Sequence, residues 1–457
     1  MPTTIVSVFR GKLPRALARL ACGALAIGPL ALRAAEPAPA GEPGDGSVPW
    51  ALHGQVTNVT QGHPPFHAPY SGDNSLRPDG RTEETTDATL YAGARLWRGT
   101  ELWINPEIDQ GFGLSNTLGV AGFPSGEAYK VGQNTPYLRL PRFFLRHVIA
   151  LGGASEKVEG VANQLAGSRP ANNVTLTLGK FSAVDVFDLN AYAHDPRADF
   201  FNWSIVESGA FDYAADPWGY TYGMAAEWNQ DRWTVRGGLF QLSPAPNSKI
   251  VAPDLRKFMF VAEAESRFEW RGRPGKLRVL GFVDHAPLAR YRDAVDLARA
   301  SGGTPDVDLV RRVANKAGGA LNAEQEIADG VGAFARVSFN DGAFEAYDFT
   351  EINRSIAGGL SIEGRRWGRE RDTLGIAAAA NALSHDARDY FAAGGMGILI
   401  GDGALAYRAE RIFETYYAAR FGRWLTVSLD YQRASDPAHN ADRGPVNIYA
   451  LRVHAEF

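Results

Sequence analysis

The sequence predicts an exported all-β protein whose strands close into an antiparallel transmembrane barrel. Three observations predict this fold class: an N-terminal segment with the layout of a signal peptide, apolar and polar residues that alternate along strand-length stretches, and a final strand that ends on Phe457. In hydrocarbon, strands satisfy all their backbone hydrogen bonds only when the sheet closes on itself.

The N-terminus has the parts of a signal peptide. Basic residues at positions 10–19 precede a short apolar stretch at 20–32. This stretch is shorter than the roughly 20 residues that a helix needs to cross a bilayer. We therefore expect residues 1–35 to be cleaved during export, the Pro- and Gly-rich residues 36–49 to form a flexible linker, and residues 50–457 to form the barrel.

Period-two alternation follows the linker. Between Thr89 and Trp97, the apolar residues Leu90, Ala92 and Leu96 share one face, while polar residues and glycine fall on the other. The same pattern recurs in three further stretches, 173–180, 333–340 and 424–432. Their length matches the roughly 9–11 residues of a tilted membrane-spanning strand, whereas soluble strands average about 5–6 residues. The alternation therefore favours a membrane barrel over a soluble sandwich.

Tight turns separate the predicted strands, and tryptophans flank two of them. Trp97 and Trp103 surround one turn, and Trp228 and Trp233 surround another. This spacing predicts an aromatic girdle at a membrane interface, although ordinary cross-strand aromatic pairing is the alternative. The predicted turns are 98–100, 229–232, 271–275, 340–342, 364–372, 401–403 and 421–423.

Three long segments are predicted to be loops. Residues 111–136 are rich in glycine, and residues 185–220 are rich in Asp, Tyr, Trp and Asn. The third segment, 286–330, contains helix-like stretches at about 288–301 and 307–316, which we expect in an extracellular or lumen-folded loop. Long loops alternating with short turns are typical of bacterial outer-membrane barrels.

The C-terminal strand resembles the assembly signal of outer-membrane barrels. Tyr449, Leu451, Val453 and Phe457 lie on one apolar face, and the chain stops on that face. We expect this strand to contact the barrel-assembly machinery, and the barrel surface to contact outer-membrane lipids and lipopolysaccharide.

Composition and motifs argue against several other functions. A net charge of −4 does not indicate a nucleic-acid partner. The single cysteine, Cys22, lies in the leader, so no disulfide framework or cysteine metal site is expected. Neither a nucleophile-elbow motif nor a zinc-protease motif occurs. In the pairs His194-Asp195 and His385-Asp386 the neighbours would point to opposite faces of a strand. We therefore predict no catalytic residue, metal ligand or cofactor.

Several segments of the chain resemble the carbohydrate-selective porins of the OprB type. They are 105–107, 179–190, 192–197, 201–203, 218–220, 414–417 and 442–445. The resemblance extends over roughly residues 50–457. It implies an outer-membrane barrel, commonly of 16 strands, through which sugars diffuse by way of a constricted lumen. The Ala- and Arg-rich insertion at 286–330 departs from the family, which puts the sugar preference in doubt.

A sugar pore needs polar side chains that exchange hydrogen bonds with water, and aromatic faces against which the sugar ring can slide, with binding weak enough to permit exit. We expect the constriction in residues 185–203. The candidate pore-lining residues are Arg95, Glu107, Arg139, Lys180, Asp185, Asp188, His194, Asp195, Arg197, Trp203 and Tyr220, with Asp109, Arg142, Arg236, Arg336 and Tyr192 as further lumen-facing candidates.

Other functions stay open at this point. A general small-solute or anion porin would share the fold, and the local excess of arginine at 139–146 keeps it in consideration. An outer-membrane barrel enzyme would need a Ser/His/Asp set that the sequence does not present. A soluble, secreted carbohydrate-binding protein would be extracted without detergent. A monomer and a trimer are both compatible with the sequence.

Overall fold

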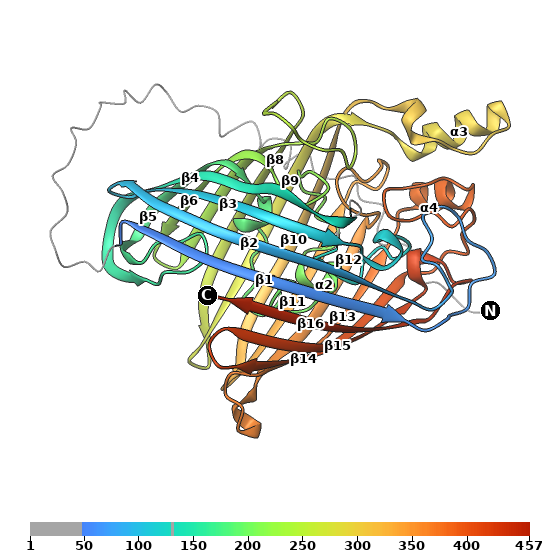
Figure 1. Cartoon of the computed structure of the whole chain (residues 1–457). Helices are drawn as coiled ribbons and strands as arrows, with labels where there is room; N and C mark the ends of the chain where they lie inside the picture. Colours follow the sequence, from blue (N-terminus) through green and yellow to red (C-terminus); the bar gives the residue numbers. More distant parts are fainter. Residues whose placement is uncertain (1–47, 129–131) are drawn as a thin grey trace, which may run out of the picture. The chain divides into compact units, whose positions relative to one another are not determined.

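The computed structural model describes residues 48–128 and 132–457 (Figure 1). These residues form a closed barrel of 16 antiparallel strands, as the sequence and the family resemblance predicted. The predicted signal peptide and all but the last two residues of the predicted linker lie outside the described residues. The strands are β1 (Trp50–His63), β2 (Arg81–Trp97), β3 (Thr100–Gly111), β4 (Gln133–Val158), β5 (Gly167–Phe181), β6 (Thr221–Gln230), β7 (Trp233–Gln241), β8 (Phe258–Trp270), β9 (Arg273–Leu288), β10 (Arg312–Ala328), β11 (Val331–Asn340), β12 (Arg354–Glu363), β13 (Thr373–Ala382), β14 (Glu410–Phe421), β15 (Leu425–Ser435) and β16 (Val446–Glu456).

Each strand pairs with its neighbours in sequence, and β1 pairs with β16 to close the barrel. Beyond the end of β16, the backbone of Phe457 exchanges two hydrogen bonds with Gly54, at 2.9 and 3.1 Å. A Cβ at residue 54 would lie 2.5 Å from the Phe457 ring, so glycine leaves room for the terminal side chain. Closure removes the unpaired strand edges that hydrocarbon would penalise.

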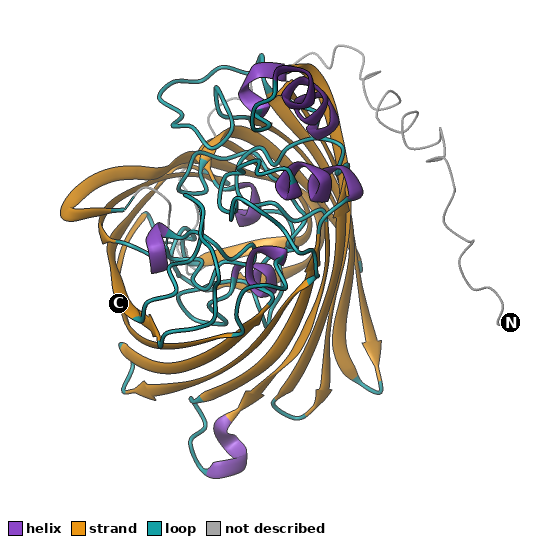
Figure 2. Cartoon of the chain, turned by 90° about the vertical axis from the view of Figure 1, so that its right-hand side faces the viewer, coloured by secondary structure: helices purple, strands orange, loops and turns teal. Residues whose placement is uncertain are grey.

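One end of the barrel carries mostly short turns, and the other carries the long loops. Strand pairs such as β2–β3, β6–β7 and β8–β9 are joined by two residues each. The connections at the opposite end contain α2 (Trp203–Val206), α3 (Tyr291–Ser301), α4 (His385–Ala392) and most of the 3₁₀ turns. Viewed from the long-loop end, these connections extend across the barrel opening (Figure 2). Short turns face the periplasm in bacterial barrels.

The outer wall confirms the predicted alternation. Side chains such as Leu90, Leu176, Val337 and Leu429 point outward and are exposed, whereas their sequence neighbours face the lumen. Exposed tryptophans gather where the short turns lie: Trp50, Trp97, Trp228, Trp233, Trp270 and Trp424. This arrangement suits an aromatic girdle at the periplasmic interface.

Trp103 is a correction to the predicted girdle. It lies on the lumen face of β3 with 0% exposure, and its indole N–H donates to Glu101 over 3.0 Å. The outward face of β3 carries Leu102, Ile104 and Ile108, so the period of two places Trp103 inside.

Three further predictions about turns and helices were wrong. The helix predicted at 307–316 is a 3₁₀ turn, Val307–Val310, followed by β10, because residues from Arg312 onward pair with β9. The predicted insertion therefore shrinks to residues 289–311, where α3 confirms the first predicted helix. Residues 340–342 were predicted to be a tight turn, but Asn340 ends β11 and residues 341–353 form a longer loop. Residues 401–403 lie within the β13–β14 loop, where Asp402 accepts hydrogen bonds from Ser75 and Asn440.

In the described part of the chain, no helix is long and apolar enough to cross a membrane.

Candidate functional site

The β5–β6 connection, residues 182–220, folds into the lumen, and we call it the constriction loop. Most of its side chains are buried. The carboxylate of Glu414, on the inner wall of β14, accepts hydrogen bonds from the backbone N–H groups of Phe201 (2.5 Å) and Asn202 (3.0 Å). The Asn202 side chain in turn caps α2 by accepting from the N–H of Ser204. The wall thus satisfies backbone donors that burial would otherwise leave unpaired.

Arg336 joins the two halves of the constriction loop to β11. Its guanidinium donates to the carbonyl oxygens of Ala193 and Ile205, both at 2.7 Å. Its Nε also lies 3.6 Å from the carboxylate of Asp188, and both side chains are almost fully buried. Hydrogen bonds from a charged donor contribute about 1.5–3 kcal/mol each, so this one side chain holds much of the loop in place.

Arg452 performs a similar role from β16. It donates to the carbonyl oxygens of Pro196 (2.7 Å), Ala198 (2.9 Å) and Asp199 (2.9 Å). These three residues surround Arg197, so Arg452 fixes the backbone from which the Arg197 side chain extends.

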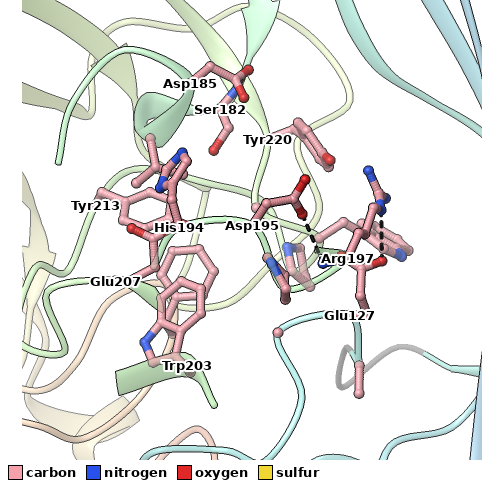
Figure 3. Close-up of a pocket in the computed structure, with 18 of the residues that line it drawn as sticks. Glu127, Ser182, Asp185, His194, Asp195, Arg197, Trp203, Glu207, Tyr213 and Tyr220 are labelled. Carbon is pink, nitrogen blue, oxygen red and sulfur yellow. Dashed lines mark hydrogen bonds and ion pairs between the residues drawn. The ribbon is translucent and has the colours of Figure 1, made fainter. Parts of the chain in front are cut away.

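Arg197 is the centre of an ion-pair network between the constriction loop and the barrel wall. Its guanidinium lies 3.2 Å from Asp87 and 3.3 Å from Glu107. It also lies 3.0 Å from Glu127 (Figure 3). Asp87 and Glu107 belong to β2 and β3, whereas Glu127 belongs to the β3–β4 loop. Burial raises the pKa of the Glu127 carboxyl well above its ordinary value, and the nearby Arg197 opposes that shift.

A second arginine cluster lies beside this network. Arg139 pairs with Glu107 and Asp109, and its guanidinium carbon lies 5.2 Å from the centre of the Trp218 ring. Arg142 lies three residues further along β4, and its guanidinium carbon is 4.8 Å from the centre of the Tyr220 ring. Guanidinium groups over aromatic faces keep both side chains in fixed positions.

Two cavities lie in the lumen, on either side of Arg197. The long-loop cavity has a volume of about 290 Å³ and is lined by Arg142, Asp185, Trp218 and Tyr220, among others. The short-turn cavity has a volume of about 510 Å³, and its lining includes turn residues such as Asp329 and Arg365. Arg197 lines both cavities.

The structure brings together many of the predicted pore residues. Asp185, His194, Asp195, Arg197, Trp203 and Tyr220 line the long-loop cavity. Glu107 pairs with Arg197, which lines this cavity, and Arg139 pairs with Glu107. The segment predicted to form the constriction, 185–203, is part of the loop that fills the lumen.

Three predicted residues lie elsewhere. Arg95 is near the short-turn end, where it donates to the backbone carbonyls of Val48 and Ala166. Lys180 lies 3.5 Å from Asp216. Asp188 is buried within the constriction loop, where it accepts from Ser208 and Asn322. None of the three lines either described cavity.

Trp203 reaches the cavity without offering an open ring face. Its ring stacks between Phe123, with ring centres 4.9 Å apart, and Phe349, at 4.7 Å. Both faces are therefore covered, and only the ring edge remains for a solute. Tyr220 and Trp218 also line this cavity, and arginine side chains lie over their rings.

Sequence reasoning missed Glu127, Glu414 and Arg452. Glu127 lies in a glycine-rich loop without periodicity, so no pattern marked it. Glu414 and Arg452 fall on the inner face of strands with clear alternation, and that alternation could have identified them as lumen residues.

Asp199 gives the lumen a pH-dependent charge. Burial raises the pKa of the Asp199 carboxyl to about 6, and this residue lines the short-turn cavity. Its charge is present above that pH and is lost as the pH falls below it.

We expect the cation preference of the pore to rise as the pH increases through about 6. Reversal potentials measured across a salt gradient between pH 4.5 and 8 test this expectation, and Asp199→Asn should flatten the profile. An unchanged profile in the variant would contradict it.

Comparison with known proteins identifies the family of this chain. The model of the family described as "Carbohydrate-selective porin, OprB family" matches residues 73–457. Pseudomonas putida OprB has a similar structure, with 17% identity, coverage of 90% of this chain and 94% of that chain, and a TM-score of 0.68. The DcaP channel of Acinetobacter baumannii (11% identity, coverage 89% and 97%, TM-score 0.48) and OmpF of Salmonella typhi (11%, 90% and 98%, 0.46) are less similar. No curated protein matches the chain significantly.

Proposed function

Because the chain belongs to the OprB family of carbohydrate-selective porins, we propose that its sugars follow a path through the two cavities joined at Arg197. The protein is an outer-membrane porin, and therefore a channel and not an enzyme. Small polar solutes such as sugars pass through it by diffusion. The residues that these solutes contact, and the order of contacts, are the subject of the proposal.

One observation carries the proposed path: Arg197 belongs to the lining of both cavities. A solute entering from the long-loop side would meet Trp218 and Tyr220, which line the cavity together with Arg142. It would then pass Arg197 and its carboxylate partners, which can exchange hydrogen bonds with hydroxyl groups. The short-turn cavity would release it to the periplasm.

The volume of the long-loop cavity indicates the size of the solute. At about 290 Å³, it is just below the range of roughly 300–1,000 Å³ that is typical of small-molecule sites. We infer that monosaccharides such as glucose pass most readily, and that small oligosaccharides pass more slowly.

The charge around Arg197 weighs against an anion porin. Two arginines, Arg197 and Arg139, face four carboxylates, which belong to Asp87, Glu107, Asp109 and Glu127. Burial raises the pKa of the Glu127 carboxyl, but the other three carboxylates still outnumber the two arginines. A path with this balance disfavours anions more than neutral sugars.

Liposome swelling tests the proposed function. Purified protein in liposomes should admit a monosaccharide faster than a disaccharide, and a disaccharide faster than a trisaccharide, at equal osmolarity. Protein-free liposomes and heat-denatured protein serve as controls. Equal rates for sugars and for amino acids of the same size would instead indicate a general porin.

We further propose that residues 1–35 are a cleaved signal peptide and that the strand ending in Phe457 contacts the barrel-assembly machinery. Outer-membrane lipids and lipopolysaccharide would cover the apolar wall, around a monomer or a trimer. Mass spectrometry of protein extracted from outer membranes tests the cleavage, because an intact N-terminus would contradict it.

A further inference from the structure

The hairpin between β4 and β5 extends beyond the barrel and then bends. The last residue of β4 that pairs with β3 is His147, and β6 begins to pair with β5 only at Asn173. Among the residues that the structure describes, the intervening parts of β4 and β5 therefore form a two-stranded ribbon with no other neighbour in the sheet. Figure 1 shows this hairpin curving at the short-turn end of the barrel.

Two glycines produce the bend. Gly152 and Gly153 have φ angles of +110° and +86°, which only glycine adopts without strain. The β4–β5 register shifts on both sides of Gly152, as in a β-bulge, and bulges bend a strand pair.

The bend brings the end of the hairpin, residues 161–165, against the lumen wall; we call these residues the hairpin tip. The Nδ2 of Asn105 donates to the side-chain oxygen of Asn163 over 2.8 Å, and Arg146 donates to the Asn163 carbonyl over 2.6 Å. Leu165 is 1% exposed and joins the buried apolar cluster that contains Trp103. An isolated two-stranded ribbon is marginally stable, so these contacts fix its position.

The hairpin tip forms part of the long-loop cavity. Ala162 and Asn163 line this cavity together with Arg142 and Tyr220. The cavity is therefore bounded both by the constriction loop and by a hairpin that starts at the short-turn end. Asn163 has a φ of +62°, a left-handed conformation that asparagine tolerates better than most residues.

The side chain of Asn163, which lines the cavity, also has unused hydrogen-bonding capacity among the described residues. Its side-chain oxygen accepts from Asn105, and within residues 48–128 and 132–457 no acceptor engages its NH₂ group. This side chain is partly exposed. A sugar hydroxyl is an acceptor of the kind that the NH₂ group requires.

We propose that the hairpin tip is a second selectivity element of the pore, in which Asn163 donates to a sugar hydroxyl and Ala162 narrows the cavity. This inference rests on the proposed function, since it assigns further residues to the same sugar path. It makes the pore selective through two elements: the constriction loop, and a hairpin that belongs to the periplasmic side.

Cysteine modification tests the position of the tip. The barrel region has no cysteine, because the only one is Cys22. In planar bilayers, Ala162→Cys channels treated with a charged methanethiosulfonate reagent should lose roughly half of their conductance, because the added group fills part of a cavity of about 290 Å³. Val161→Cys is the matched control: it is adjacent, 51% exposed and outside the cavity lining. Mass spectrometry checks that the reagent has labelled both variants. A conductance that stays the same after labelling of the Ala162→Cys channel would overturn the proposal.

A second pair of variants tests the hydrogen bond. Asn163→Ala should weaken the block of current by a monosaccharide roughly three- to tenfold, the loss expected for one hydrogen bond. Gln164→Ala is the control: this neighbouring amide donates to the Glu159 carbonyl and lies outside the cavity lining, so its removal should change the block much less. An equal loss in both variants would contradict the donor role. If sugar does not reduce the wild-type current, the proposed function fails. If sugar blocks the wild type and Asn163→Ala equally well, the proposed function stands and only the role of the hairpin tip fails.

Discussion

Arg336→Ala channels are expected to conduct several-fold better than wild type and to lose most of their block by sugars. The variant removes two hydrogen bonds, at 2.7 Å each, that join Ala193 and Ile205 of the constriction loop to β11. It also leaves the buried Asp188 without the nearby guanidinium. Breaking a buried ion pair costs about 3–5 kcal/mol, which is enough to release the loop while the barrel keeps its strand pairing.

The measurement is single-channel conductance together with liposome swelling in a trisaccharide. Arg354→Ala is the matched control, because Arg354 begins the adjacent strand β12 and is exposed. Heat-modified migration in gels confirms that each variant forms a barrel. Wild-type conductance in a correctly folded Arg336→Ala barrel would show that the loop does not depend on this arginine.

Arg197→Gln is expected to shift the pore strongly toward cations. Asp87, Glu107 and Glu127 lie within 3.3 Å of the Arg197 guanidinium, and the variant removes their shared positive partner. A change of one charge contributes about 1 kcal/mol at contact distance even in water. The sign is opposite for cations and anions, so the permeability ratio should change roughly thirtyfold.

Reversal potentials across a salt gradient measure this ratio. Arg299→Gln, on the exposed face of α3, serves as the control because it removes the same charge far from the Arg197 network. Sugar block should weaken in Arg197→Gln as well, since the guanidinium lines both cavities. A selectivity equal to that of the control variant would place the narrowest part of the path elsewhere.

The strands could be predicted because membrane barrels impose a strict period of two. Leu90, Leu176 and Val337 face outward as that period requires, and Phe457, directly after β16, is exposed as well. The same rule would have placed Trp103 inside, since Leu102 and Ile104 mark the outer face of β3. The predicted position of Trp103 was wrong because it relied on closeness to the turn at 98–100, and not on which face of β3 the alternation assigns to residue 103.

The site was predicted only in part, because its contacts join residues that are distant in sequence. The composition of residues 185–203 indicated a constriction, but nothing in it identified Asp87 or Glu127 as partners of Arg197. Those pairs depend on how deeply the loop enters the lumen, and Glu414, Arg336 and Arg452 on the wall determine that depth. The hairpin tip was also missed. The Gly152-Gly153 pair indicates a bend in the chain only once the register shifts between β4 and β5 are known.

The most direct test of the account is the single-channel current of the membrane-extracted protein in planar bilayers, with a neutral monosaccharide added to the bath. We predict stepwise openings that the sugar reduces in a saturable manner, because the sugar occupies the cavity beside Arg197 while ions pass. Openings that are indifferent to the sugar at every concentration, or the absence of openings from correctly folded protein, would contradict the central claim.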